Sequence, residues 1–201
     1  MALSDLTFKL YTDSGLTSLF GGTYEFVHQS NFSDNPQDST LYFGSNTAGR
    51  KLQATSNPGV DQITITPTYA LPDWITVTAY ALGYSICPNS YRYEATTAGT
   101  SGASEPTWPT TIGSTVVDGT VTWTCVAQKR NVNEITLALS SGDLETNTAG
   151  AGLNIGTQVL SGTSNKITLY IRVENAIPTV SSTIGQPELT INIEEVREVE
   201  A

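Results

Sequence analysis

The stretch YRYEATTAGTSGASEPTWPTTIGSTVVDGTVTWTCV, residues 91–126, decides the fold that the sequence predicts. Its Asp118-Gly119 dipeptide stands between residues of high strand propensity and predicts a β-hairpin with a type I′ turn. After the turn, apolar residues alternate with threonines, so Trp123 and Cys125 share one face. Glycines and prolines elsewhere in the stretch favour turns over a helix. We therefore expect a small β module with an aromatic core.

Outside this stretch, apolar residues recur at every second position, which is typical of strands with one buried face. These runs are Leu6–Leu10, Tyr24–Phe26, Ile63–Ile65, Ile135–Leu139, Ile167–Val173 and Leu189–Ile193. No run repeats with helical spacing over three turns, so the sequence predicts an all-β protein, specifically an Ig-like β-sandwich. Polar and turn-forming residues predict loops at 31–39 and 45–59, and Glu194-Glu195 interrupts the last alternating run.

The character of the sequence changes twice, which suggests a discontinuous domain. Pro67 and Pro72 precede an aromatic and glycine-rich segment, and Gln128-Lys129-Arg130 closes it. We expect residues 1–72 and 131–201 to form the two parts of the sandwich. Residues 73–130 would then be an inserted β-hairpin module.

The charge balance excludes several classes of partner. Nine Lys and Arg against nineteen Asp and Glu give a net charge of −10 and a pI near 4.3. Nucleic-acid binding needs clustered cations, and anionic membranes repel such a chain, so we expect neither partner. No apolar run approaches the roughly 20 residues of a membrane span, and MALSDLTFKL does not resemble a secretory signal. We expect synthesis in a cytoplasm.

Groups that could carry a reaction are scarce. His28 is the only histidine, and no G-x-S-x-G stretch lies between a strand and a helix. One histidine and two cysteines are an unusual set for zinc, and no D-x-D-x-D-G calcium loop is present. Glu194, Glu195, Glu198 and Glu200 are expected to form a solvated acidic patch. The sequence predicts no enzyme, no cofactor and no metal site.

Two sets of residues leave alternatives open. Cys87 and Cys125 either pair as a disulfide in an oxidising exterior or lie buried as small apolar residues.

The aromatic residues Trp108, Trp123, Tyr91 and Tyr93 either stack on sugar rings of a host glycan or form the module's core, because little else there is apolar.

One pattern of residues extends through most of the module. It consists of Ala79–Gly83, Tyr93, Thr97–Gly102, Glu105-Pro106, Trp108-Pro109, Gly113, Val116–Gly119 and Val121–Trp123. This pattern resembles a surface module of tailed-bacteriophage virion proteins. The flanks resemble a family of small phage structural proteins, at Tyr42–Ser45, Gly49–Ala54, Asn57–Ile63, Leu137–Ser140, Leu153–Thr157 and Ile171–Val173.

These resemblances imply a virion structural protein, most concretely a capsid-decoration protein on the phage particle surface. The expected partners are the major capsid protein or other virion proteins, and further copies of the chain, for example as a trimer. In this reading the sandwich docks on the shell and the module projects outward. A tail, baseplate or fibre-associated protein is the second interpretation, and a glycan-binding adhesin is the third.

Overall fold

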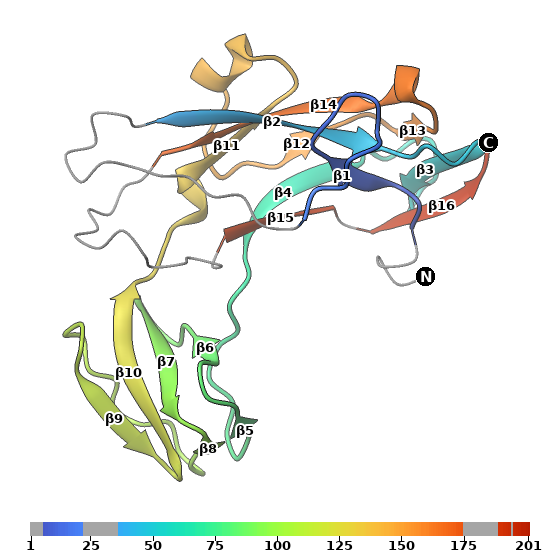
Figure 1. Cartoon of the computed structure of the whole chain (residues 1–201). Helices are drawn as coiled ribbons and strands as arrows, with labels where there is room; N and C mark the ends of the chain where they lie inside the picture. The colour runs from blue at the N-terminus through green and yellow to red at the C-terminus, as the bar shows by residue number, and fades with distance from the viewer. Residues whose placement is uncertain (1–5, 22–35, 175–188, 194) are drawn as a thin grey trace. The chain divides into compact units, whose positions relative to one another are not determined.

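The computed structural model describes residues 6–21, 36–174, 189–193 and 195–201. In this part of the chain the elements are strands and short 3-10 helices, so the all-β prediction is confirmed. The chain divides into two compact units (Figure 1). Residues 69–130 form one, which we call the aromatic module, and the described residues on either side form the other, the sandwich unit. The module thus begins four residues before the predicted position 73.

The sandwich unit contains one four-stranded sheet and two three-stranded sheets, and all their described pairings are antiparallel. The first has the order β1 (Lys9–Tyr11), β2 (Gln37–Gly44), β14 (Ile167–Val173), β11 (Ile135–Ala138). The others are β12 (Leu153–Asn154), β4 (Thr64–Tyr69), β15 (Leu189–Ile193), and β13 (Gln158–Leu160), β3 (Arg50–Ala54), β16 (Val196–Glu200). The 3-10 helices η2 (Val132–Glu134), η3 (Gly142–Glu145) and η4 (Thr163–Asn165) lie between strands.

One apolar core joins these sheets, which gives the unit its sandwich-like character. Residues of the four-stranded sheet pack with residues of both three-stranded sheets, because each strand turns alternate side chains inward. The buried members include Leu41, Phe43, Leu52, Ile63, Ile65, Ile135, Leu137, Val159, Leu169 and Ile171. The immunoglobulin-like connectivity stays a prediction.

Two predicted loops are in part strands. The loop at 45–59 contains β3, the central strand of its sheet, whose Leu52 is fully buried. The loop at 31–39 ends in the first residues of β2, where Asp38 forms a bidentate ion pair with Arg172 of β14. Pairing with neighbours distant in sequence overrides local propensity in both cases. Tyr24, Phe26 and His28 lie outside the described residues.

The interruption of the last run occurs as predicted. Strand β15 ends at Ile193, Glu195 has a positive φ of 47°, and β16 begins at Val196. The two strands belong to different sheets.

The aromatic module contains a four-stranded antiparallel sheet and a two-stranded pair. The sheet has the order β6 (Ser85–Ile86), β7 (Tyr91–Thr97), β10 (Val121–Gln128), β9 (Thr115–Asp118), and the pair is β5 (Ala79–Tyr80) with β8 (Gly99–Thr100) (Figure 1). Its core is separate from that of the sandwich unit and contains Tyr80, Ile86, Tyr93, Ala95, Val121, Trp123 and Cys125.

The two ends of the module meet. The Lys129 ammonium lies 4.3 Å from the centre of the Tyr69 ring, and the Tyr69 hydroxyl is 2.6 Å from Cys87 Sγ. An inserted unit needs such adjacent ends, because its host must continue from one strand to the next.

Candidate functional site: the aromatic module and its exposed apolar surface

Trp123 is the centre of the module's core. Its ring is fully buried on β10, with Tyr80 in an edge contact at 4.9 Å and Trp108 at 6.1 Å between centroids. Tyr93 of β7 packs on Trp108 at 4.5 Å. Aromatic pairs at these separations contribute beyond the area that they bury. The alternation of apolar residues with threonines therefore predicted the inward orientation of Trp123 correctly.

Asp118 is a buried hydrogen-bond acceptor. Its Oδ2 accepts from the indole N–H of Trp74 at 2.8 Å and of Trp123 at 3.2 Å, and its Oδ1 accepts from the backbone N–H of Gly102 at 2.7 Å. The side chain is 3% exposed. A carboxylate at this depth is tolerated because three donors compensate its lost hydration.

The hairpin turn differs from the prediction by one residue. Asp118 pairs with Val121 as the last residue of β9, so the turn residues are Gly119 and Thr120. Gly119 has a φ of 62°, whereas Thr120 is not among the residues with positive φ, so the turn is not type I′. The indole hydrogen bonds draw Asp118 inward and fix this register.

The glycines of the module permit one close backbone contact. The turn docks against β8, where the Thr120 N–H donates to the Thr100 carbonyl at 2.9 Å. A Cβ on Gly99 would lie 2.4 Å from the carbonyl oxygen of Thr120, and one on Gly119 would be closer still to the Thr100 carbonyl oxygen. Gly99 and Gly119 thus allow the turn to approach β8 this closely.

The four predicted glycan-contact residues differ in how deeply they are buried. Trp123 and Tyr93 are fully buried, so neither ring can stack on a sugar, and the core interpretation is correct for both. Burial also raises the pKa of the Tyr93 hydroxyl, which donates to the Pro109 carbonyl at 3.0 Å. Trp108 and Tyr91 are partly buried against the same core. Contact of these two residues with a glycan stays a prediction.

The cysteines do not form the disulfide that one alternative predicted. No disulfide joins Cys87 and Cys125, and both side chains are buried. Burial raises the pKa of the Cys125 thiol, which disfavours the reactive thiolate. These are the properties of small apolar core residues.

An exposed apolar surface, which sequence reasoning missed, lies on the segment that leads into β6. Ile75, Val77, Leu82 and Tyr84 are 55%, 66%, 70% and 43% exposed, and Ala79 and Ala81 between them are exposed as well. We call these six residues the apolar surface. Trp74 and Tyr80, at even positions, turn inward instead. The period-two spacing of Ile75, Val77, Ala79 and Ala81 was the available signal.

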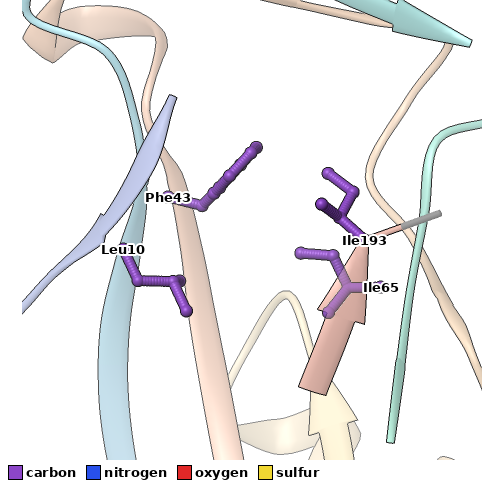
Figure 2. A pocket seen from close by; sticks show the side chains of 4 residues that line it. All are labelled: Leu10, Phe43, Ile65 and Ile193. Atoms are coloured by element: carbon purple, nitrogen blue, oxygen red, sulfur yellow. The ribbon is translucent and has the colours of Figure 1, made fainter. Parts of the chain in front are cut away.

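The sandwich unit offers an apolar hollow of about 60 Å³ (Figure 2). Leu10 of β1 and Phe43 of β2 line one side, and Ile65 of β4 and Ile193 of β15 line the other. The lining carries no group that could orient a polar ligand. The hollow is a packing gap between the sheets rather than a reaction site.

Charged side chains in the sandwich unit serve the fold. Glu198 was expected in a solvated patch, but it is 4% exposed and accepts from the Thr7 N–H, the Thr7 hydroxyl and Arg50 Nε, each within 2.7 Å. Burial raises the pKa of this carboxyl, but the bonds from Arg50 and Thr7 outweigh burial and lower it overall. The prediction is wrong for Glu198 alone, because the alternation of β16 turns this side chain inward toward Thr7. Glu195 and Glu200 are exposed as predicted, and Glu194 lies outside the described residues.

Arg172 joins two carboxylates on the four-stranded sheet. It lies 2.7 Å from Asp38 and 2.7 Å from Glu145, and these contacts lower the pKa of both acids. Among the described residues, no group of three or more His, Cys, Asp or Glu side chains is placed to hold a metal ion. That part of the chain also has no helix of the length and apolarity that crossing a membrane requires.

Comparison with known protein families, curated proteins and solved structures finds no match.

Proposed function

We propose that the chain is a non-enzymatic structural protein of a tailed-phage virion, and specifically a capsid-decoration protein of the head surface. The observation that carries the proposal is that the residues behind the phage resemblance are architectural. Gly99, Asp118, Gly119 and Trp123 build the docked turn and the core of the module. A likeness located in such residues supports a shared fold and a shared role as a surface module.

The polar residues support the same interpretation. Asp118, Glu198 and Arg172 each satisfy their hydrogen bonds within the fold. Groups engaged in this way stabilise a scaffold and are not poised to transfer a proton or attack a substrate. A decoration protein acts through surface complementarity, repeated over many identical sites.

The charge distribution suggests which unit meets the shell. Residues 69–130 hold three of the nine Lys and Arg and four of the nineteen Asp and Glu, so their net charge is −1 and the rest carries −9. An acidic unit suits a basic surface, because complementary charge accelerates encounter and fixes orientation. We therefore propose that the sandwich unit is the part of the chain that contacts the major capsid protein.

Copy number in purified virions tests the proposal. Heads and tails are separated after disruption, and the chain is quantified in each by mass spectrometry against the major capsid protein. We expect the chain on emptied heads, in a fixed ratio to the capsid protein. Recovery with tails, at tens of copies or fewer, would favour a tail component, and absence from both fractions would refute a virion role.

A further inference from the structure

Hydrogen bonds hold the backbone of the apolar surface at Ile75 and Val77, although the segment has little regular structure. The Tyr80 hydroxyl accepts from the Ile75 N–H at 3.0 Å, and the Ser101 hydroxyl donates to the Ile75 carbonyl at 2.7 Å. The Val77 N–H donates to the Gly102 carbonyl at 3.1 Å. A surface fixed in advance loses little conformational entropy when a partner binds.

Val77 occupies a backbone conformation that its side chain disfavours. Its φ is 48°, a left-handed value that is unusual for a β-branched residue and common for glycine or asparagine. Its side chain is 66% exposed, so no core packing in the described structure explains the choice of valine. Strain of this kind is retained where a side chain has a use.

The segment that carries the surface is itself uncharged, with Asp73 as the charge that directly precedes it. Residues 74–91 contain no Asp, Glu, Lys or Arg, although the whole chain carries −10. Interface centres are depleted of charge, and exposed apolar patches mark contact sites. A partner chosen by charge would find no charged side chain within residues 74–91.

A second copy of the chain is the occupant that this chemistry fits. Two sandwich units, at −9 each, repel one another, whereas two modules, at −1 each, can approach. An identical apolar surface on the second copy is complementary without any charged partner, as a two-fold symmetric contact requires. We propose that the apolar surface, centred on Ile75, Val77 and Leu82, binds the same surface of a second copy. This inference does not rest on the virion assignment.

Sedimentation velocity of the full chain tests the contact, from about 1 to 200 µM, a range that brackets a small interface with a micromolar Kd. We expect the weight-average mass to rise with concentration toward a dimer or higher species. The rise should persist at about 0.5 M NaCl, because apolar association is not screened.

Two aspartate variants locate the contact. Val77→Asp places one negative charge from each copy in the proposed contact. Because aspartate tolerates a positive φ, we expect the fold to be preserved. We expect association to weaken about tenfold or more. Val60→Asp is the matched control, because Val60 is 65% exposed but lies in the sandwich unit. This variant should associate as the unaltered chain does.

Three results would overturn the proposal. The first is an unaltered chain that remains monomeric over the whole range. The second is equal weakening by both aspartate variants. The third is a monomeric chain whose binding on a glycan array is lost in Val77→Asp, which would assign the surface to a carbohydrate. The thermal unfolding temperature of Val77→Asn, which keeps the backbone conformation without charge, separates loss of contact from loss of fold.

Discussion

Replacing Asp118 by alanine removes the acceptor of three hydrogen bonds at once. Trp123 is fully buried, so its indole N–H would lose its acceptor, whereas Trp74 and Gly102 are partly exposed and their N–H groups can turn to water. A buried donor without a partner costs about 1–3 kcal/mol, and the two partly exposed donors cost less. We expect Asp118→Ala to lower the free energy of unfolding of the module by about 2–4 kcal/mol.

The chain provides its own probe for this measurement. All three tryptophans, Trp74, Trp108 and Trp123, lie in the aromatic module, so their fluorescence reports the unfolding of the module alone. Far-UV circular dichroism reports both units. In a guanidinium titration, Asp118→Ala should move the fluorescence transition to lower denaturant and leave a later dichroism transition of the sandwich unit in place.

A second carboxylate that bonds an indole supplies the control. Glu105 accepts from Trp108 Nε1 at 2.7 Å, but it does so at the surface. Glu105→Ala should change stability by less than about 0.5 kcal/mol, because water replaces the carboxylate. Equal losses in both variants, or an Asp118→Ala variant as stable as the unaltered chain, would refute the reasoning.

Three further predictions follow from single features. Gly99→Ala should destabilise the module by about 1–3 kcal/mol in the fluorescence titration, because its Cβ meets backbone atoms, whereas Gly21→Ala in open space should be neutral. The folded pKa of Glu198 is lowered, so its stabilising contribution is present above about pH 4.3, the unfolded value, and is lost as pH falls through the folded value. The difference between the unfolding temperatures at pH 7 and pH 3, measured by circular dichroism, should therefore be smaller in Glu198→Gln than in the unaltered chain. A thiol reagent should label neither Cys87 nor Cys125 in the native protein and both after unfolding without reductant, and labelling of neither after unfolding would indicate a disulfide.

Regular alternation made much of the fold predictable. Ile135, Leu137, Leu169 and Ile171 lie in the core, as their spacing indicated, because strand geometry alone assigns such residues to one face. Strand β3 escaped prediction, because RKLQA has a single large apolar residue. Its strand character comes from β13 and β16 on either side, which are more than 100 residues away in sequence.

The exposed apolar surface escaped prediction for a related reason. Alternation shows that two sets of residues face opposite ways, but not which set faces the core. Between Trp74 and Ala81, the aromatic residues at even positions fill the interior, and the aliphatic residues at odd positions remain outside. The inward turn of Asp118 was equally hidden, because its partners Trp74 and Gly102 meet it only in the folded module.

Excision of the module tests most directly the claim that the chain consists of two separately cored units. Residues 69–130 are replaced by a short glycine-serine turn from Thr68 to Asn131, and the shortened chain is measured by far-UV circular dichroism and size-exclusion chromatography. We expect a soluble β protein that unfolds cooperatively, because the two cores share no residue and the ends of the module meet. Aggregation, or loss of the β-sheet signal, would contradict the account.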